Sequence, residues 1–326
     1  MPFIVELQTA VEIDERGIAR LERALGVDLV PIWTFKYLAY GGVAARLLGG
    51  PLRGLLLQIA HQPDGYPVAL EILYMRYFSD RTSRGQYEPE LIEAGRELLR
   101  RIVYRNAGQG DGYKIAEVVR VCAAGADGGA IAAEVALRLR QAVAEYETHS
   151  FHNEELLKAL LEVQAIAVLD ALFEGGEEDQ RSGLEVFNQL GSDNPADVIS
   201  CGVLVAWCDI DPEIRYPLAS AIITFNDRRK GSVAQQWSEQ AVALLVSAPT
   251  PEKVLTIFVK RFRPSSWSGS RAAIMEANAR LLDSVSEISP SLLSVAMDAK
   301  FQLEQDVDRD RQLETERDYI RNERFE

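Results

Sequence analysis

Hydrophobic residues recur along this 326-residue chain at intervals of three and four positions, and alternation at every second position is almost absent. The first interval is typical of amphipathic α-helices and the second of β-strands. Most periodic segments open with Pro, Ser, Asp or Asn and close with Gly or a short polar turn, as helices do. The pattern predicts about fifteen helices of roughly 11–22 residues each. The clearest segments are residues 31–48, 51–61, 67–78, 89–105, 113–124, 129–147, 154–174, 179–190, 195–208, 233–247, 251–262 and 270–285.

Many of the predicted helices are apolar on more than one face, as in the run 167–172. Such a helix is buried between neighbours on both sides, an environment that stacked helical hairpins provide. The sequence therefore predicts an all-α fold, a right-handed α-solenoid of stacked helical hairpins with about fifteen helices. Only Phe3–Leu7 is a candidate strand. We expect a lead-in at residues 1–30, two halves of the solenoid at 31–175 and 176–299, and a charged C-terminal helix at 300–326.

The stretch DIDPEIRYPLASAII, residues 209–223, shows how one hairpin is expected to form. Asp209 and Asp211 fall in a turn between two helices, where a carboxylate can accept free backbone N–H groups. Pro212 suits the first helical position, and Arg215 is then within reach of Asp209 or Asp211. The side chains expected to point into the core are Ile214, Leu218, Ala219 and Ile222.

This order of residues resembles the second-helix signature of the HEAT repeat, Asp-x-x-Pro-x-Val/Ile-Arg-x-x-Ala, with one spacing that differs by a residue. Pro217 also departs from the signature, because proline removes a hydrogen bond within a helix. The helix is therefore expected to kink at Pro217 or to begin there. The resemblance implies an α-solenoid of degenerate repeats of about 40 residues, and it implies no activity.

The charge of the chain narrows the choice of partners. Its formal net charge is −14 and its pI is near 4.9, so phosphates and anionic membranes are repelled unless a local basic patch binds them. No apolar run reaches the length of about 18–20 residues that a membrane span needs, and the N-terminus lacks the basic start of a signal peptide. We expect a cytoplasmic protein with no membrane partner and no cofactor.

The three cysteines, Cys122, Cys201 and Cys208, are an odd number in a long chain. Cys201 and Cys208 are spaced to lie on one face of a helix as small core residues. This usage suits a reducing compartment better than a disulfide framework.

Two short motifs invite a chemical interpretation. Glycines precede Lys114 in NAGQGDGYKIAEVV, residues 106–119, but a phosphate-binding loop requires G-x-x-x-x-G-K-S/T after a strand. We interpret this segment as a turn between helices. In ETHSFHNEE, residues 147–155, His149 and His152 lie near carboxylates that could complete a metal site. Because no third histidine is nearby, a turn with ordinary capping residues, Ser150 and Asn153, is the favoured interpretation.

The segment KRFRPSSWSGSRAAI, residues 260–274, is the one locally basic stretch of an acidic chain. Free amides and the dipole at the start of its helix favour anions, and hydroxyl groups add donors, so a phosphate or an acidic partner segment is one predicted ligand. The alternative is that the arginines pair with acidic residues on neighbouring helices while Trp267 fills the core. The candidate binding residues are Lys260, Arg261, Arg263, Trp267, Ser268, Ser270 and Arg271.

The C-terminal segment, residues 300–326, mixes arginine with Asp and Glu, which predicts a solvated helix supported by pairs four residues apart. The alternative is an arm that docks on a partner, which requires its apolar residues to be exposed. Those residues are Phe301, Leu303, Val307, Leu313, Ile320 and Phe325. Together with residues 261–282, this segment resembles the C-terminal helical module of large bacterial antiphage-defence proteins. The resemblance implies a helical solenoid that follows an effector or NTPase domain.

The sequence contains no nucleophile elbow and no Cys–His arrangement. We therefore predict a non-enzymatic helical-repeat scaffold or recognition module that binds another protein or another domain of a larger assembly. The resemblance above implies a role in antiphage defence. The alternative is nucleic-acid or nucleotide sensing through the basic segment Lys260–Arg271. A metal-dependent enzyme centred on His149 and His152 is the least favoured of the three.

Overall fold

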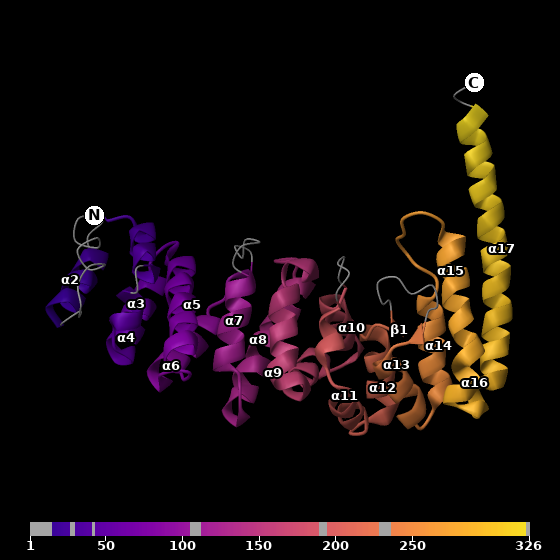
Figure 1. Ribbon diagram of the computed structural model, residues 1–326, viewed down its shortest axis with the longest axis horizontal. Helices are drawn as coiled ribbons and strands as arrows, with labels where there is room; N and C mark the ends of the chain where they lie inside the picture. The colour runs from indigo at the N-terminus through magenta and orange to yellow at the C-terminus, as the bar shows by residue number, and fades with distance from the viewer. Residues whose placement is uncertain are drawn as a thin grey trace. The chain divides into compact units, whose positions relative to one another are not determined.

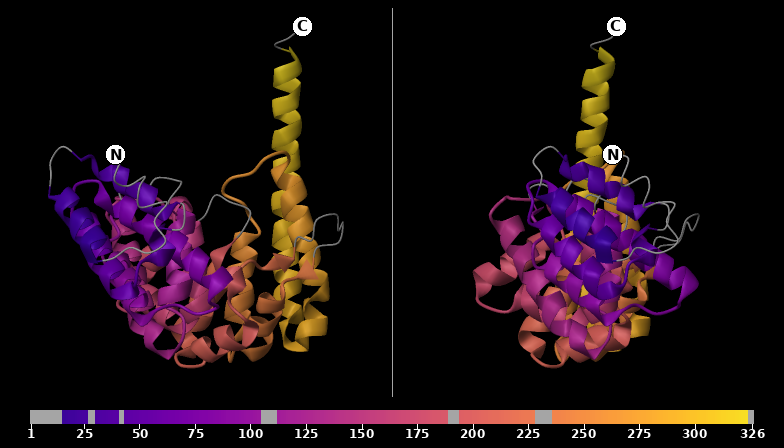
Figure 2. Two further views of the ribbon diagram at one scale, coloured as in Figure 1. Left: turned by 60° about the vertical axis from the view of Figure 1, so that its left-hand side comes forward. Right: turned by 90° about the vertical axis from the view of Figure 1, so that its left-hand side faces the viewer.

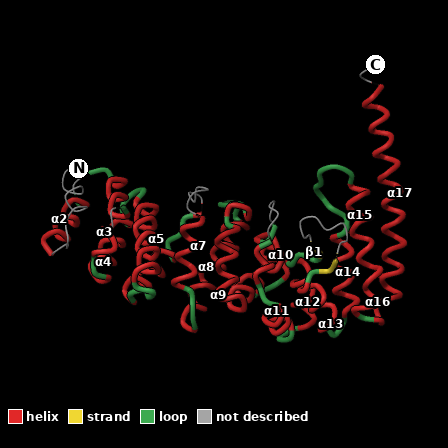
Figure 3. Tube along the Cα trace, in the orientation of Figure 1, coloured by secondary structure: helices red, strands yellow, loops and turns green. Residues whose placement is uncertain are grey.

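The computed structural model describes residues 15–26, 30–40, 43–104, 112–188, 194–227 and 236–323 (Figure 1). Within this part of the chain the fold is all-α, as predicted. The exception is a small antiparallel ribbon of two strands, β1 (Asn226–Asp227) and β2 (Gln236–Trp237), drawn in yellow in Figure 3. The strand candidate Phe3–Leu7 lies outside the described residues. None of the described helices combines the length and the apolarity that crossing a membrane demands.

The chain divides into two compact units, residues 1–198 and residues 199–326. Unit 1 contains α2 (Glu15–Leu25), the 3₁₀ helix η1 (Ile32–Ala39), α3 (Val43–Arg46), α4 (Gly49–Ala60), α5 (Gly65–Ser83), α6 (Pro89–Leu99), α7 (Gly112–Cys122), η3 (Ala126–Gly128), α8 (Gly129–Ala144), η4 (Ser150–His152), α9 (Glu154–Phe173), α10 (Glu177–Val186) and η5 (Pro195–Val198). Unit 2 contains α11 (Cys201–Cys208), α12 (Pro212–Ile222), α13 (Glu239–Ser247), α14 (Pro251–Arg261), α15 (Arg271–Ala279), η6 (Arg280–Ser284), α16 (Val285–Ile288), η7 (Pro290–Leu292) and α17 (Leu293–Glu323).

The helices of unit 1 contact one another in two interleaved rows. One row runs through α2, α4, α6, α8 and α10, and the other through η1, α5, α7 and α9, with each helix touching the next in its row. Contacts between α4 and α5, between α6 and α7, and between α8 and α9 join the rows. Figures 1 and 2 show these helices following one another side by side in chain order. Consecutive helices therefore form hairpins that pack against their neighbours in sequence.

Apolar residues at helical spacing hold these rows together. In α4, for example, Leu52, Leu55, Leu56 and Ile59 are each at most 1% exposed. Their spacing of three and four residues is the one that places side chains on the same helix face. Proline begins α6, α12 and α14, where its missing N–H has no intrahelical partner to lose. The periodicity therefore predicted these helices and their starts correctly.

Three predicted helices are shorter than the periodicity indicated. Residues 31–48 form η1 and the short α3 instead of one helix, because Tyr40 leaves η1 in an extended conformation. Residues 195–208 divide into η5 and α11, because the hydroxyl of Ser200 caps a new helix by accepting from the Val203 N–H. In the predicted helix 233–247, the described residues begin at Gln236 with strand β2, and the helix α13 follows Ser238, whose hydroxyl accepts from the Ala241 N–H at 3.1 Å. Capping hydrogen bonds explain the starts of the last two helices, and the spacing of hydrophobic residues gives no indication of such bonds.

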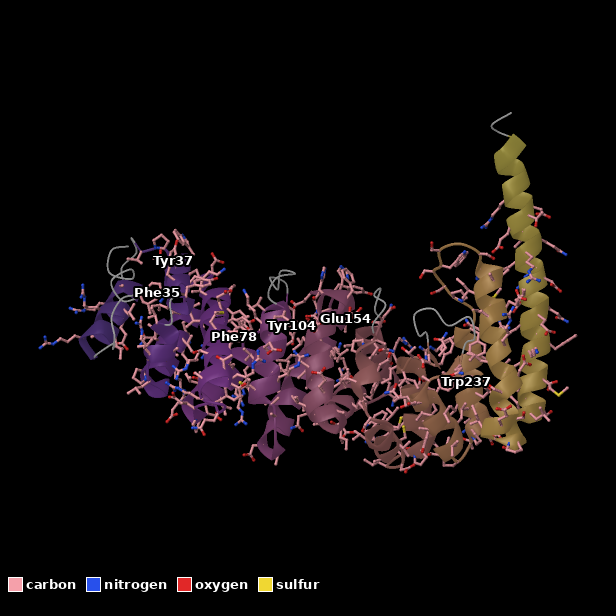
Figure 4. All side chains as sticks on the ribbon, viewed as in Figure 1. Phe35, Tyr37, Phe78, Tyr104, Glu154 and Trp237 are labelled. Carbon is pink, nitrogen blue, oxygen red and sulfur yellow. The ribbon has the colours of Figure 1, made fainter. Side chains whose placement is uncertain are left out.

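Unit 2 has an aromatic core. Trp237 is 8% exposed, and its ring lies 5.6 Å from that of Phe258 and 5.9 Å from that of Phe262, centre to centre (Figure 4). Its indole N–H donates to the backbone oxygen of Leu281 at 2.9 Å. This buried indole explains why the chain before α13 pairs as strand β2 and does not continue the helix, since an indole N–H in a core requires an acceptor.

The stretch 209–223 forms the helix α12 as expected, but its inward face differs from the prediction. The helix begins at Pro212 and continues through Pro217. Ile214, predicted to point into the core, is 44% exposed, and that prediction is wrong because Tyr216, at 2%, occupies the core side. The remaining predicted core positions are buried, namely Leu218, Ala219 and Ile222.

Candidate functional site

The arginines of the basic segment make hydrogen bonds within unit 2. Arg261 donates to the backbone oxygen of Ser220 at 2.6 Å, and its guanidinium lies 5.3 Å from the ring centre of Phe225. Arg263 donates to the carboxylate of Asp306, on α17, at 2.8 Å. Both side chains are half-buried. Arg263 therefore follows the alternative interpretation, in which the arginines pair with acidic residues on neighbouring helices, whereas the contacts described for Arg261 are with a backbone oxygen and an aromatic ring.

The start of α15 already carries an anion, and that anion belongs to the chain itself. The hydroxyl of Ser270 donates to Glu314 at 2.7 Å, and the other carboxylate oxygen of Glu314 accepts from the Ala272 N–H at 3.2 Å. The hydrogen bond from Ser270 lowers the pKa of Glu314 below its ordinary value. Arg271 donates to Asp310, one turn earlier on α17, at 2.5 Å. The donors at the start of α15 are therefore engaged by carboxylates of α17, and binding of an external anion there stays a prediction.

The remaining candidates of the segment are exposed. Trp267 is 47% exposed, so the expectation that it fills the core is wrong, and its ring stacks 5.2 Å from the guanidinium carbon of Arg271. Lys260 and Ser268 are also exposed. Trp267 lines a surface groove of about 580 Å³ between its turn and α17, where Leu313 and Arg317 stand opposite.

The carboxylates that meet the basic segment share one face of α17. Asp306, Asp310 and Glu314 follow one another at intervals of four residues, which places them along one edge of the helix. Beside them Val307 packs with Ala272 and Met275 of α15. The apolar positions predicted for a docking arm are therefore divided between two environments: Leu303 and Val307 are buried, Phe301 and Leu313 are exposed, and the side chains of Ile320 and Phe325 lie outside the described part of the chain.

Arg215 is half-buried and lies against the end of α11. Its guanidinium donates to the backbone oxygen of Trp207 at 3.2 Å and sits 4.9 Å from the centre of that ring. Asp209 accepts from the Tyr216 hydroxyl at 2.8 Å. Asp211 is exposed and its side chain makes no capping hydrogen bond. Pairing of Arg215 with Asp209 or Asp211 stays a prediction.

The two histidines of the turn before α9 contact an aromatic ring. His149 and Phe151 stack in nearly parallel planes with centres 5.3 Å apart, and the His152 ring lies 4.1 Å from that of Phe151. The side chain of Asn153 donates to Thr148 and to the His149 backbone oxygen, which ties the turn together. Across the described residues, no group of three His, Cys, Asp or Glu side chains is arranged to hold a metal ion.

The cysteines are free, and two of them are buried. Burial raises the pKa of Cys122 to about 12, and burial also raises that of Cys208 to about 12. Both thiols are therefore protonated at neutral pH. Cys201 is half-buried, so only Cys208 of that pair is a core residue as predicted.

Unit 1 carries a surface that the sequence analysis missed. Large aromatic side chains are about half exposed on η1 and the residue that follows it, on α5, which contacts both other elements, and on α7. We call this set the aromatic surface: Trp33, Tyr37, Tyr40, Phe78 and Tyr113. Figure 4 labels Tyr37 on η1 and Phe78 on α5. Tyr113 also meets Tyr74 of α5 edge-on, with ring centres 6.0 Å apart.

A buried carboxylate, Glu71, joins the three elements beneath this surface. Glu71 is 6% exposed and accepts hydrogen bonds from the Tyr40 hydroxyl, at 3.0 Å, and from the Lys114 ammonium group. Lys36 adds an ion pair at 3.8 Å. Lys114, the residue that suggested a phosphate-binding loop, is therefore the partner of a carboxylate. The glycine-rich residues 106–111 before it lie outside the described part of the chain.

These contacts set the charge state of the cluster. Burial by itself raises the pKa of Glu71, but the hydrogen bonds from Lys114 and Tyr40 and the charges of Lys114 and Lys36 outweigh it, so the pKa is lowered. The hydrogen bond to Glu71 raises the pKa of Tyr40. The carboxylate is ionised and engaged by its donors at neutral pH. The cluster fixes the positions of the side chains around Glu71, and the side chains of the aromatic surface are about half exposed.

A signal for this surface was present in the sequence. IWTFKYLAY, residues 32–40, contains aromatic residues far more densely than the rest of the chain. Phe35 is fully buried, whereas Trp33, Tyr37 and Tyr40 are about half exposed. Tyr40 follows η1 in an extended conformation, so helical periodicity does not describe where its side chain lies.

Comparison of the chain with protein-family models, with curated proteins and with solved structures finds no match.

Proposed function

We propose that the chain is an α-solenoid that acts as a non-enzymatic recognition module, and that it binds a partner protein through the aromatic surface of unit 1. The single observation that carries the proposal is the half exposure of Trp33, Tyr37, Tyr40, Phe78 and Tyr113 on three contacting elements. The interleaved contacts of the helices within unit 1 support the solenoid, because helices of stacked hairpins touch their sequence neighbours in two rows.

Aromatic side chains favour a protein partner. Tyr, Trp and Phe are enriched at protein interfaces, and Trp and Tyr dominate the residues whose truncation weakens binding most. Each contributes a large contact area at low cost in conformational entropy. The Glu71 cluster adds rigidity, because it ties η1 and α7 to α5 and so fixes the rings before a partner arrives.

Nucleic-acid sensing through the basic segment is less well supported. Arg263 and Arg271 pair with carboxylates of α17, and Arg261 is engaged with a backbone oxygen. A phosphate would have to compete with these contacts against a net charge of −14. We therefore expect no shift of DNA or RNA in a gel titration at low salt, and a salt-sensitive shift lost in Lys260→Glu would support the alternative.

Affinity capture from the native source tests the proposal. We expect the wild-type chain to enrich a partner that a Trp33→Ser/Tyr113→Ser variant captures at least about tenfold less, because interface aromatics are each worth about 1–2 kcal/mol or more. Tyr146→Ser is the matched control, since Tyr146 is 86% exposed in unit 1 but lies outside the aromatic surface. Equal capture by all three proteins, with unchanged melting temperatures, would contradict the proposal.

A further inference from the structure

The first three turns of α17 expose a stripe of large apolar side chains. Leu293 is 49% exposed, Met297 64% and Phe301 63%. Spacing of four residues places them one above another on the helix surface. The side of α17 that packs into unit 2 is a different one, formed by Ala296, Leu303 and Val307, which are at most 4% exposed. We call Leu293, Met297 and Phe301 the outer stripe.

The line of the outer stripe continues into acidic residues. Glu304 follows Phe301 by three positions and Asp308 follows Glu304 by four, so both lie farther along the same line of α17. Both are exposed. Glu304 makes no ion pair with any side chain that the structure describes, and Asp308 is 4.0 Å from Arg311. This line of the helix is therefore apolar at its start, carries Glu304 and Asp308 next, and then reaches Arg311, which pairs with Glu276.

The groove beside this line carries charges of both signs. It has a volume of about 420 Å³ and lies between α17 and the end of α15, with Glu304 and Asp308 on its wall. Its basic side chains already face carboxylates: Lys300 pairs with Asp283 at 2.5 Å, Arg311 with Glu276 at 2.5 Å, and Arg280 with the same Glu276 at 3.5 Å. The carboxylates of Glu304 and Asp308 remain as the charges available to an incoming group.

A water-exposed helix of a soluble protein normally places charged or polar residues where α17 places Leu293, Met297 and Phe301. Contiguous exposed apolar side chains beside polar residues are typical of surfaces that another molecule covers. We propose that the outer stripe, with Glu304 and Asp308, binds an amphipathic helix of a partner protein, with aliphatic side chains against the stripe and lysine or arginine against the carboxylates. This surface lies in unit 2 and does not depend on the aromatic surface of unit 1.

Binding of a designed helical peptide to the full-length chain tests the proposal. The probe is a peptide of about 20 residues, long enough to be helical, with leucine at heptad positions a and d and lysine at the exposed positions. The control peptide carries glutamate in place of lysine. We expect the lysine peptide to bind at least about tenfold more tightly than the glutamate peptide, and its affinity to fall as salt rises.

Three variants make the test specific to this surface. Met297→Glu/Phe301→Glu should weaken binding of the lysine peptide at least about tenfold. Leu313→Glu is the matched control, since Leu313 is 47% exposed on another side of α17, and it should leave the affinity within about twofold. Glu304→Lys/Asp308→Lys should reverse the preference between the two peptides. Melting temperatures of all variants establish that they are folded.

Three outcomes would overturn the proposal. The first is equal affinity for the two peptides. The second is a loss in Leu313→Glu as large as in the stripe variant. The third is self-association of the wild-type chain that the stripe variant abolishes, because the occupant would then be a second copy of this chain.

Discussion

Glu71 shows how one buried carboxylate can organise a surface. Its oxygens accept from Tyr40 and Lys114 and pair with Lys36, so the side chains of η1, α5 and α7 meet at one charge. Replacing it with glutamine removes the negative charge that Lys114 and Lys36 engage. We expect Glu71→Gln to lower the free energy of unfolding by about 1–3 kcal/mol at pH 7, measured by chemical denaturation.

The same residue predicts a pH dependence. The folded-state pKa of Glu71 is lowered, so its stabilising contribution is present above the ordinary carboxyl pKa of about 4.3 and is lost as pH falls through the lower folded value. The wild type should therefore lose stability relative to Glu71→Gln as pH falls from about 5 to about 3. Denaturation profiles that run parallel across this range would show that the carboxylate is not held as described.

Arg76 is a second residue whose role no sequence pattern reveals. It is fully buried in α5, where it pairs with Asp80 at 2.9 Å and with Glu88 at 2.5 Å, and donates to the backbone oxygen of Leu47 at 2.6 Å. Removing it leaves Asp80, 1% exposed, with Arg84 at 3.7 Å as its remaining ion pair among the described side chains. This one arginine links α5 to the chain before α4 and to the start of α6.

We expect Arg76→Leu to destabilise the protein by about 3 kcal/mol, because breaking a buried pair leaves a buried charge uncompensated. Arg81→Leu is the matched control on the same helix: its side chain is 54% exposed and its pair with Glu117 is a surface pair worth less than about 1 kcal/mol. Thermal denaturation of both variants measures the difference. Equal losses would mean that the Arg76 network contributes no more than a surface ion pair.

At the scale of the element, the pairing of α15 with α17 decides how the basic segment is used. The two helices run antiparallel, with Ala272 beside Glu314 and Glu276 beside Arg311. Ala272, Met275 and Val307 form an apolar seam between the two helices. On one side of this seam, Asp306 and Asp310 of α17 pair with Arg263 and Arg271. On the other side, Lys300 and Arg311 of α17 pair with Asp283 and Glu276. α17 is 31 residues long, about 46 Å, and extends past the start of α15 within unit 2 (Figure 2).

Neutralising the acidic side of this seam should loosen α17. In Asp310→Asn/Glu314→Gln we expect amide hydrogen exchange in residues 303–314 to accelerate by roughly threefold to tenfold, because Arg271 and the start of α15 lose their anions. Asp308→Asn is the control, since Asp308 is 74% exposed at its side chain and faces away from the basic segment. Similar acceleration in the control would mean that charge on α17 in general, and not these pairs, holds it.

The sequence predicted the class of the elements better than their ends. Apolar periodicity and N-terminal prolines predicted α6, α12 and α14, because both features act within one helix. The ends at Ser200 and Ser238 depend on single capping hydroxyls, and the strand at Trp237 depends on a distant acceptor, Leu281. The pattern of neighbouring residues contains no information about a hydrogen-bond acceptor that is distant in the sequence.

The candidate site was also predictable only in part. The basic segment was recognised as a run of positive charge. The sequence could not decide between anion binding and internal ion pairs, because the carboxylates that pair with its arginines lie some 40 residues away on α17. The aromatic surface could not be recognised from the sequence, because buried and exposed aromatic residues look alike in a hydrophobic pattern. Trp33 and Tyr37 are apolar residues within a periodic segment, and only their exposed fractions of 51% and 45% in the folded chain reveal that they face outward.

At the scale of the whole molecule, we propose that the aromatic surface of unit 1 binds the partner and that the basic segment of unit 2 stabilises the fold of that unit. Substitutions in the two regions should therefore have different effects on the affinity for the partner. Lys260 is the cleanest probe of the basic segment, because it is exposed and no ion pair with it is described. Trp33 and Tyr113 are the corresponding probes of the aromatic surface.

The most direct test is calorimetric titration of the captured partner into the wild type, Trp33→Ser/Tyr113→Ser and Lys260→Glu. We expect Trp33→Ser/Tyr113→Ser to bind about 100-fold more weakly than the wild type, a loss of about 2.7 kcal/mol in binding free energy. Lys260→Glu should bind within about twofold of the wild type. An affinity that falls in Lys260→Glu and is unchanged in the aromatic variant would contradict the proposal.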